Sequence, residues 1–271
     1  MTGNTSDAGD GVQYHLEVER GDVADAVLLP GDPERVDDVV ETWDESTEVA
    51  RHREYRTATG RYDGTPISVT STGIGSPSAA IAVEELARVG AETLIRVGSC
   101  GSVGEAAVGD LVITSGAIRS EGTSDDYVRD DYPAAADHEV VSALIAAAER
   151  LGYEYHVGVT MSADGFYAGQ ARDGYDGYRA PGSEGLLDGL RAANVENVEM
   201  EASAILTLAS IYGLRAGAVC TVFADRDTGE FRVTGEGRAA ACASLAVHLL
   251  ARMDAAKREA GADRWHAGLS L

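Results

Sequence analysis

The most constraining stretch of the sequence is residues 94–101, LIRVGSCG, an apolar run that ends in glycines. This pattern predicts a short buried strand of a parallel sheet that runs into a glycine-rich turn. Arg96 interrupts the run, and a buried guanidinium is costly unless an anion pairs with it. The glycines and Ser99 offer backbone N–H groups where the strand ends, which favours an anion bound at the carboxyl edge of the sheet. A structural salt bridge to one of the 45 Asp and Glu residues is the alternative.

Strand and helix patterns alternate along the rest of the chain, as they do in α/β proteins. The order strand, helix, strand over residues 65–97 requires a parallel pair with a right-handed crossover. Because the sequence shows no repeat and no linker, we predict a single domain over residues 14–271 behind a mobile tail of residues 1–13. Strands are predicted at residues 26–30, 65–71, 93–97, 110–117, 155–161 and 214–223, and helices at 33–42, 79–89, 137–151, 186–193, 202–212 and 236–260.

The charge balance restricts the partners of the protein. Its 271 residues carry a net charge of −23, from 22 Lys and Arg against 45 Asp and Glu. Such a surface repels nucleic acid and anionic membranes, and the even spread of acids indicates the surface of a halophilic protein. The sequence has no apolar run of ~18 residues and no signal-peptide pattern, so we expect a cytoplasmic protein.

Several common kinds of site are disfavoured by residue spacing. The three cysteines form no CxxC pair and the six histidines no HxxxH pair, which argues against a disulfide framework and a zinc site. Gly73-x-Gly75 lacks the third glycine of a dinucleotide-binding turn, and no acidic residue ends the next strand.

The turn after the strand at residues 26–30 is suited to an anion. Asp32 fits an N-cap and Pro33 the first helical position, so that free N–H groups lie beside Arg35. An ordinary capped turn is the alternative. The glycine-rich residues 228–237 are a candidate lid.

The loop of residues 162–172 is suited to a flat polar ring. Phe166 can stack on such a ring, while Gln170 and Arg172 offer an acceptor and donors to its edge. A polar surface loop with a packed aromatic residue is the alternative.

Taken in order, these motifs resemble the nucleoside phosphorylase family I, and within it the uridine phosphorylases most closely. The resemblance covers about residues 14–255. It rests on Pro30-Gly31-Asp32-Pro33-x-Arg35, His52-Arg53-Glu54, Ser71-Thr72-Gly73-Ile74-Gly75, Arg96-Val97-Gly98, Phe166-Tyr167-x-Gly169-Gln170-x-Arg172 and Glu199-Met200-Glu201.

The resemblance implies an α/β fold, a three-layer α/β/α sandwich with a central mixed, partly barrel-like sheet. It implies a pentosyltransferase of pyrimidine salvage that cleaves uridine reversibly with phosphate into uracil and ribose 1-phosphate. Phosphate is a co-substrate, no cofactor is required, and the assembly is a homohexamer built as a trimer of dimers. A purine nucleoside phosphorylase of the same family is the main alternative. A nucleosidase and a binding protein without catalysis are further ones.

The resemblance also implies a role for individual residues. Arg96, Glu201 and Arg172 are the expected catalytic residues. The phosphate ligands are Gly31, Arg35, Arg96 and Ser99, with Arg53 contributed by a neighbouring subunit. Ribose is bound by Glu199, Met200 and Glu201, and by His15 across the dimer interface. The base is bound by Phe166, Gln170, Arg172 and Arg226. Glu54, Ile74 and Ser78 match a monovalent-cation site, for K⁺, at the dimer interface of some members.

Two positions leave the base preference open. Val198 stands where bacterial uridine phosphorylases often carry tyrosine, and Asp225 lies near the aspartate with which purine enzymes protonate N7. Because an arginine favours carbonyl acceptors, Gln170 and Arg172 favour uracil. We therefore expect Asp225 to pair with Arg226 or Arg172 instead of with a base.

Overall fold

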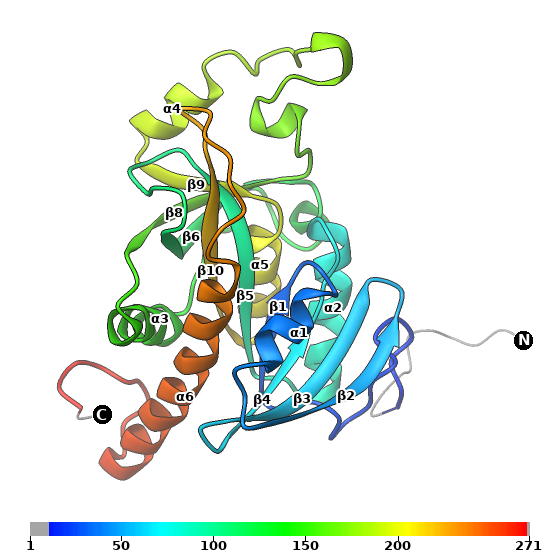
Figure 1. The fold of residues 1–271 in the computed structure, drawn as a ribbon. Helices are drawn as coiled ribbons and strands as arrows, with labels where there is room; N and C mark the ends of the chain where they lie inside the picture. The colour runs from blue at the N-terminus through cyan, green and yellow to red at the C-terminus, as the bar shows by residue number, and fades with distance from the viewer. Residues whose placement is uncertain (1–10, 270–271) are drawn as a thin grey trace, which may run out of the picture.

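A single ten-stranded sheet organises the computed structural model, which describes residues 11–269 (Figure 1). The strands, in chain order, are β1 (Ala26–Pro30), β2 (Glu45–His52), β3 (Tyr55–Tyr62), β4 (Thr65–Thr70), β5 (Thr93–Ser102), β6 (Leu111–Ser120), β7 (Ala134–Ala135), β8 (Tyr155–Ala163), β9 (Val195–Glu199) and β10 (Arg215–Asp225). The helices are α1 (Arg35–Val40), α2 (Ser76–Val89), α3 (His138–Leu151), α4 (Leu186–Ala192), α5 (Ala202–Tyr212) and α6 (Glu236–Ala260), with 3₁₀ turns η1 (Ser124–Asp126), η2 (Ala168–Gln170) and η3 (Tyr175–Gly177).

One part of the sheet closes on itself. Strands β10, β6, β8, β9 and β5 pair in that order, and β5 also pairs with β10, which closes a five-stranded barrel. The sheet then extends from β5 through β1, β4, β3 and β2. Strand β1 is parallel to β4 and β5, whereas β9 runs antiparallel to β5. The prediction of a mixed, partly barrel-like sheet is confirmed.

Helices cover both faces of the sheet, which gives the predicted three layers. On one face α1, α3 and α6 pack over a core that includes Leu28, Ile95 and Val219. On the other face α2 and α5 pack over Val27, Leu29 and Leu94. The side chains of successive residues of β1 and β5 therefore enter opposite cores, as the two-residue period of a strand requires.

Strand β5 differs from its prediction in one respect that matters for function. The sequence predicts a turn from Gly98 onward, but the strand continues to Ser102 because β10 pairs with it along its whole length. The glycines are therefore strand residues beside the site and do not form a turn.

Helix α6 is the one helix among residues 11–269 that is long and apolar enough to cross a membrane, with a mean hydropathy of 1.2 over its best window in Gly237–Ala260. That window is 56% buried inside the protein. Ala243, Leu249 and Met253 of α6 pack in the core with Leu144 of α3. Packing against the sheet therefore accounts for the apolar face of this helix.

The predicted N-terminal tail is described only from residue 11 onward. Residues 1–10 of the predicted tail lie outside the described residues, while Gln13 is buried and its backbone N–H donates to the Val18 carbonyl at 2.8 Å. Cys100, Cys220 and Cys242 are buried free thiols.

Candidate active site

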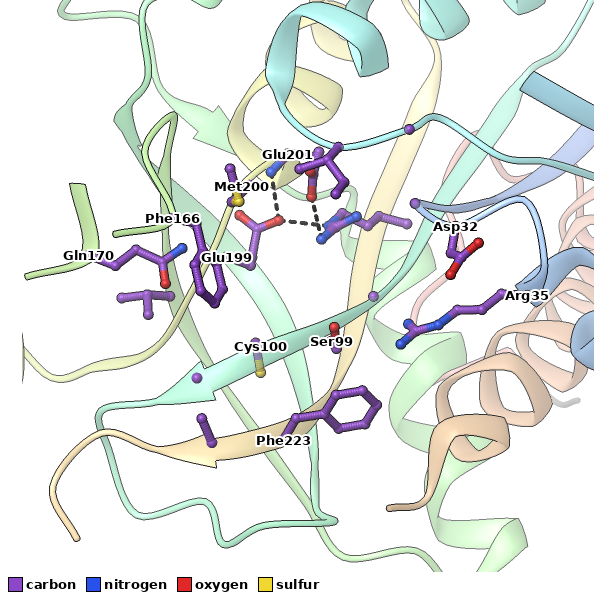
Figure 2. A pocket seen from close by; sticks show the side chains of 18 of the residues that line it. Asp32, Arg35, Ser99, Cys100, Phe166, Gln170, Glu199, Met200, Glu201 and Phe223 are labelled. Atoms are coloured by element: carbon purple, nitrogen blue, oxygen red, sulfur yellow. Dashed lines mark hydrogen bonds and ion pairs between the residues drawn. The ribbon is translucent and has the colours of Figure 1, made fainter. Parts of the chain in front are cut away.

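A cavity opens where one edge of β5 lacks a neighbouring strand. Strand β1 pairs with β5 only as far as Val97, and β9 pairs with β5 from Gly101 onward. Between them, residues 98–100 face a cavity of about 770 Å³ (Figure 2). Its lining comes from Gly31, Asp32, Pro33, Arg35, Glu54, Gly73, Ile74, Ser78, Arg96, Gly98, Ser99, Cys100, Gly101, Phe166, Gln170, Arg172, Val198, Glu199, Met200, Glu201, Phe223, Ala224 and Phe231.

Arg96 is held on the wall of this cavity by two glutamates. Its Nε donates to Glu199 Oε2 at 2.7 Å, and its Nη2 lies 2.5 Å from Glu201 Oε2. All three residues are nearly inaccessible, with 3–4% of their surface exposed. The third nitrogen, Nη1, is buried and has no hydrogen-bond partner among the described residues. The salt bridge that the sequence left as an alternative is therefore present, with two carboxylates as partners, and one donor group of Arg96 is left without a partner among the described residues.

The charges of this cluster depend on one another. Burial alone would lower the pKa of Arg96, but the carboxylates of Glu201 and Glu199 outweigh it and raise that pKa further above its usual range. Burial raises the pKa of Glu201, and the charge of Glu199 adds to the effect against the opposing influence of Arg96. Arg96 therefore stays a cation in this buried cluster.

Glu199 organises the start of α5 as well as Arg96. Its Oε2 accepts from the backbone N–H groups of Glu201 at 2.8 Å and Ala202 at 2.9 Å, and its Oε1 accepts from the Ser162 hydroxyl. A carboxylate there is favoured because the first amides of a helix have no partners within the helix. Glu201 is fixed in turn, since its Oε1 accepts from the Gly75 N–H at 2.5 Å.

Two glycines are required by this packing. A Cβ on Gly98 would lie 2.9 Å from Arg96 Nη2 and 2.8 Å from Cys220 Sγ, so a larger residue would push the guanidinium away. Gly75 has a φ of 96°, which side-chain-bearing residues rarely adopt, and this conformation turns its N–H toward Glu201.

A second wall of the cavity comes from the loop of residues 163–172, which contains η2. Figure 2 shows Phe166 and Gln170 on this side and Asp32 and Arg35 on the other, with Glu199, Met200 and Glu201 between them. The Arg172 guanidinium lies 4.4 Å from the centre of the Phe166 ring, and its Nε is buried without a partner among the described residues. Burial lowers the pKa of Arg172, since no carboxylate compensates its charge.

Arg226 holds this loop through a hydrogen bond to its backbone. Its Nη2 donates to the Gln170 carbonyl at 2.9 Å, and its aliphatic part packs 3.1 Å from the position of a Cβ on Gly101. Burial, together with the charges of Arg172 and Arg191, lowers the pKa of Arg226 to about 10. Arg226 does not line the cavity itself, so it contacts the loop of residues 163–172 and not the space for a ligand.

The β1–α1 turn closes the end of the cavity near Arg35. The backbone N–H of Glu34 donates to Asp32 Oδ1 at 2.9 Å, while α1 itself starts at Arg35, two residues later than predicted. The Arg35 guanidinium lies 5.4 Å from the centre of the Phe223 ring. Gly31 and Ser99 line the same cavity, so the structure brings together the predicted phosphate ligands Gly31, Arg35, Arg96 and Ser99.

Besides Arg226, two predicted residues do not line the cavity of their own chain. Arg53 is exposed at the tip of the β2–β3 hairpin with a φ of 57°. His15 lies outside the cavity, where its Nδ1 is 2.6 Å from Glu85 Oε1. Both positions are compatible with the expected contribution to a neighbouring subunit, which stays a prediction.

The residues of the predicted cation site lie together at the rim. The Ser78 hydroxyl donates to Glu54 Oε1 at 3.1 Å, and Ile74 is 80% exposed on the adjacent turn. All three line the cavity. Among residues 11–269, no three His, Cys, Asp or Glu side chains gather as they would for a transition-metal ion.

Sequence reasoning missed or misplaced several groups. It did not predict the aromatic residues Phe223 and Phe231, whose signal was only their place in and after the last strand. The expected pairing of Asp225 with Arg226 or Arg172 is wrong. Asp225 instead accepts from the backbone N–H groups of Asp227 at 2.8 Å and Thr228 at 3.1 Å, bonds that lower its pKa.

Comparison with known proteins identifies the class to which this fold and cavity belong. Residues 25–251 match the model of the phosphorylase superfamily, and the chain belongs to that family. It is 58% identical over 261 residues to a uridine phosphorylase of Thermococcus kodakarensis, which covers 96% of this chain and 94% of that protein. It is 46% identical over 211 residues to a guanosine phosphorylase of Halorubrum lacusprofundi, which covers 78% and 82%. A uridine phosphorylase of Escherichia coli is 41% identical over 217 residues, or 79% and 86%.

Proposed function

We propose that the protein cleaves uridine with inorganic phosphate, giving uracil and ribose 1-phosphate in a reversible reaction. The observation that carries the proposal is the arrangement of arginines: Arg96 and Arg172 line one cavity, and each keeps a buried donor without a partner among the described residues. The names of two of the relatives above support uridine as the nucleoside.

The reaction develops charge at both ends of the breaking bond. A phosphate oxygen forms a bond to C1′ of the ribose while the bond from C1′ to the base nitrogen breaks, and its electron pair leaves with uracil. Arg96, Arg35 and Ser99 hold the phosphate, whose negative charge also stabilises the cationic ribose beside it. Arg172 and Gln170 stabilise the uracil anion, which then takes a proton from water.

Glu201 and Met200 hold the ribose in this scheme. Glu201 Oε2 is presented to the cavity by Arg96, and a carboxylate oxygen accepts from sugar hydroxyl groups. Glu199 was predicted beside them, but its carboxylate already accepts from Ser162, Arg96 and the first amides of α5. Its part in ribose binding is therefore indirect.

The reaction is tested by its products. Purified protein should release uracil and ribose 1-phosphate in equal amounts from uridine, and only when phosphate is present. Release of free ribose without phosphate would identify a nucleosidase and contradict the proposal.

A purine nucleoside is the second candidate substrate, because one relative carries the name guanosine phosphorylase. The surroundings of Asp225 argue against the purine mechanism, in which an aspartate protonates N7 of the base. Backbone hydrogen bonds lower its pKa, and it does not line the cavity, so it is poorly suited to protonate N7 of a purine.

Assembly into a homohexamer, a trimer of dimers, completes the site in this proposal. Arg53 would add to the phosphate site of the neighbour and His15 to its ribose site. Mixing separately inactive Arg53→Ala and Arg35→Ala subunits should restore activity, since some sites in a mixed assembly contain both arginines. Failure of the exchanged mixture to regain activity would contradict sharing.

Two further features are part of the proposal. Glu54, Ile74 and Ser78 bind K⁺ at the dimer interface, a role supported by the Glu54–Ser78 hydrogen bond and by the oxygen atoms of the site. The protein works in the cytoplasm at high salt, as its charge of −23 suggests. Activity and sedimentation in KCl against NaCl, at low and high concentration, test both points.

A further inference from the structure

A series of buried hydrogen bonds leads from Arg96 away from the cavity. Strand β8 lies beside β9, with Ser162 paired in register with Glu199. The Ser162 hydroxyl contacts Glu199 Oε1, the carboxylate oxygen that Arg96 does not use. Ser162 is fully buried, so water does not substitute for either partner.

The direction of each hydrogen bond follows from the chemistry of the groups. Ser162 Oγ accepts from the Ser203 backbone N–H at 2.8 Å, so its own proton is free to donate to the Glu199 carboxylate. The Ser203 hydroxyl donates to Glu121 Oε1 at 2.9 Å. Glu121 is buried and is fixed in turn by the Ser124 backbone N–H at 2.9 Å and by the Ser124 hydroxyl. Each hydroxyl group between Glu121 and Glu199 therefore donates one hydrogen bond, and no proton is needed twice.

The two oxygens of Glu199 are held unequally. Oε2 accepts from Arg96 Nε and from the backbone N–H groups of Glu201 and Ala202. Oε1 has the Ser162 hydroxyl as its donor. The terminal torsion of a glutamate is broad, so the donor on Oε1 decides the plane of the carboxylate. That plane decides in turn how the guanidinium of Arg96 lies, and where its unpartnered Nη1 points.

We propose that Ser162 is a positioning residue, which aims Arg96 at the phosphate through Glu199, with Ser203 and Glu121 holding Ser162 in place. The inference rests on the proposed function, since it assumes that Arg96 binds phosphate. Ser162 does not line the cavity, so its effect reaches the ligand through Glu199 and the groups that Glu199 holds. A purely structural role, in which Ser162 only satisfies the N-terminus of α5, predicts a loss of stability without a selective loss of phosphate affinity.

The test compares two buried serines. Ser162→Ala removes the hydroxyl that orients Glu199. Ser244→Ala is the matched control, because Ser244 is equally buried on α6 and its hydroxyl oxygen accepts from Trp43 Nε1 at 3.0 Å. For each protein, inorganic phosphate binding is measured by calorimetry without nucleoside, and KM for phosphate, KM for uridine and kcat are measured by turnover.

The expected result is about tenfold weaker phosphate binding and a similar rise in KM for phosphate in Ser162→Ala, with KM for uridine changed much less. Ser244→Ala should bind phosphate like the unmodified protein, although both variants unfold at lower temperature. Ser162→Thr, which keeps the hydroxyl, should bind phosphate better than Ser162→Ala.

Two results would overturn the inference, and they differ from each other. If Ser162→Ala and Ser244→Ala bind phosphate equally well, Ser162 has no positioning role, while the proposed function stands. If the unmodified protein binds no phosphate, the proposed function fails and the inference fails with it. Should Ser162→Ala not fold, Ser162→Cys replaces it, with a smaller expected rise in KM for phosphate because a thiol is a weaker donor to Glu199 than a hydroxyl. Unchanged phosphate binding in that variant would again contradict the inference.

Discussion

The strand side of the cavity, formed by Arg96, Glu199 and Glu201, and its loop side, formed by Phe166, Gln170 and Arg172, hold their arginines in opposite ways. Arg96 has two carboxylate partners and comes from the middle of β5, which is paired with β10 throughout. Arg172 follows a 3₁₀ turn, stacks on Phe166 and has no carboxylate partner among the described ion pairs. The strand side therefore presents a preset cation, and the loop side presents a cation whose charge is uncompensated until a ligand binds.

This difference suits the two halves of the proposed reaction. Phosphate is already an anion before it binds. Glu199 and Glu201 hold Arg96 in place for it and offset the cost of an isolated buried charge. Uracil becomes an anion only as its bond to the ribose breaks, so the uncompensated charge of Arg172 favours the transition state over the bound substrate.

Removal of Arg96 should produce the largest effect. Arg96→Ala should lower phosphate-dependent turnover by at least ~10³-fold, since a preorganised charge at the reacting group is lost. It also leaves Glu199 and Glu201 buried without their cation, so the free energy of unfolding should fall by about 3–5 kcal/mol. Turnover and chemical unfolding measure the two losses. Arg215→Ala is the control, because it breaks a remote pair with Asp254 and should spare turnover in the protein that stays folded.

Removal of Arg172 should affect catalysis without the same cost in stability. We expect Arg172→Ala to lower kcat/KM for uridine by about 10²–10³-fold, the usual effect of losing one donor to a developing anion. Because no buried carboxylate is left behind, its unfolding free energy should change by less than ~1 kcal/mol. The control is Arg179→Ala, an exposed arginine of the same segment that pairs with Asp173. Equal destabilisation by the Arg96 and Arg172 variants would remove the contrast between the two sides.

A second carboxylate cluster, remote from the cavity, should set the acid limit of stability. Burial opposes ionisation of Glu139, but hydrogen bonds from Lys257, the Trp265 backbone and Arg215 outweigh it and lower its pKa. The pKa of Asp254 is lowered in the same way by Arg215 and Lys257.

The sign of the pH effect follows from these lowered pKa values. The unfolded chain binds more protons than the folded one as pH falls below the ordinary carboxylate range of about 4. The stability that Glu139 and Asp254 contribute is thus present above that range and lost below it. Glu139→Gln should make the melting temperature depend less on pH in acid. An unchanged acid slope would show that other groups set the limit.

The smallest expected effect concerns the backbone between Gln170 and Arg172. Ala171 has a φ of 53°, which costs an alanine energy that a glycine avoids. Ala171→Gly should raise the unfolding free energy by no more than ~1 kcal/mol and should change kcat/KM by about twofold at most. Asn194→Gly, at a φ of 55°, should gain less because asparagine tolerates this conformation. A large loss of uridine turnover in Ala171→Gly would show that loop rigidity is itself part of base binding.

Much of the fold was predictable because its local signals agree. Alternating apolar strands and capped helices placed β1, α5 and α6 at their observed bounds, and the family motifs predicted the sheet. The course of β5 was not predictable from its glycines, because its pairing with β10 is a contact between distant parts of the sequence.

The site was predictable in its residues but not in their partners. An arginine in an apolar strand signals a buried anion, yet the sequence does not say that Glu199 and Glu201 both reach it. Ser162 gave no signal at all, since a serine near the end of a strand is ordinary and its role depends on the register between β8 and β9.

The central claim, that uridine is the nucleoside cleaved by phosphate in this cavity, is tested most directly by competition. Uridine and guanosine are supplied together at equal concentration with phosphate, and released uracil and guanine are followed in the same vessel. The product ratio then gives the ratio of the two kcat/KM values. We predict at least ~10-fold more uracil than guanine early in the reaction. An excess of guanine would contradict the assignment and would make this chain a purine nucleoside phosphorylase.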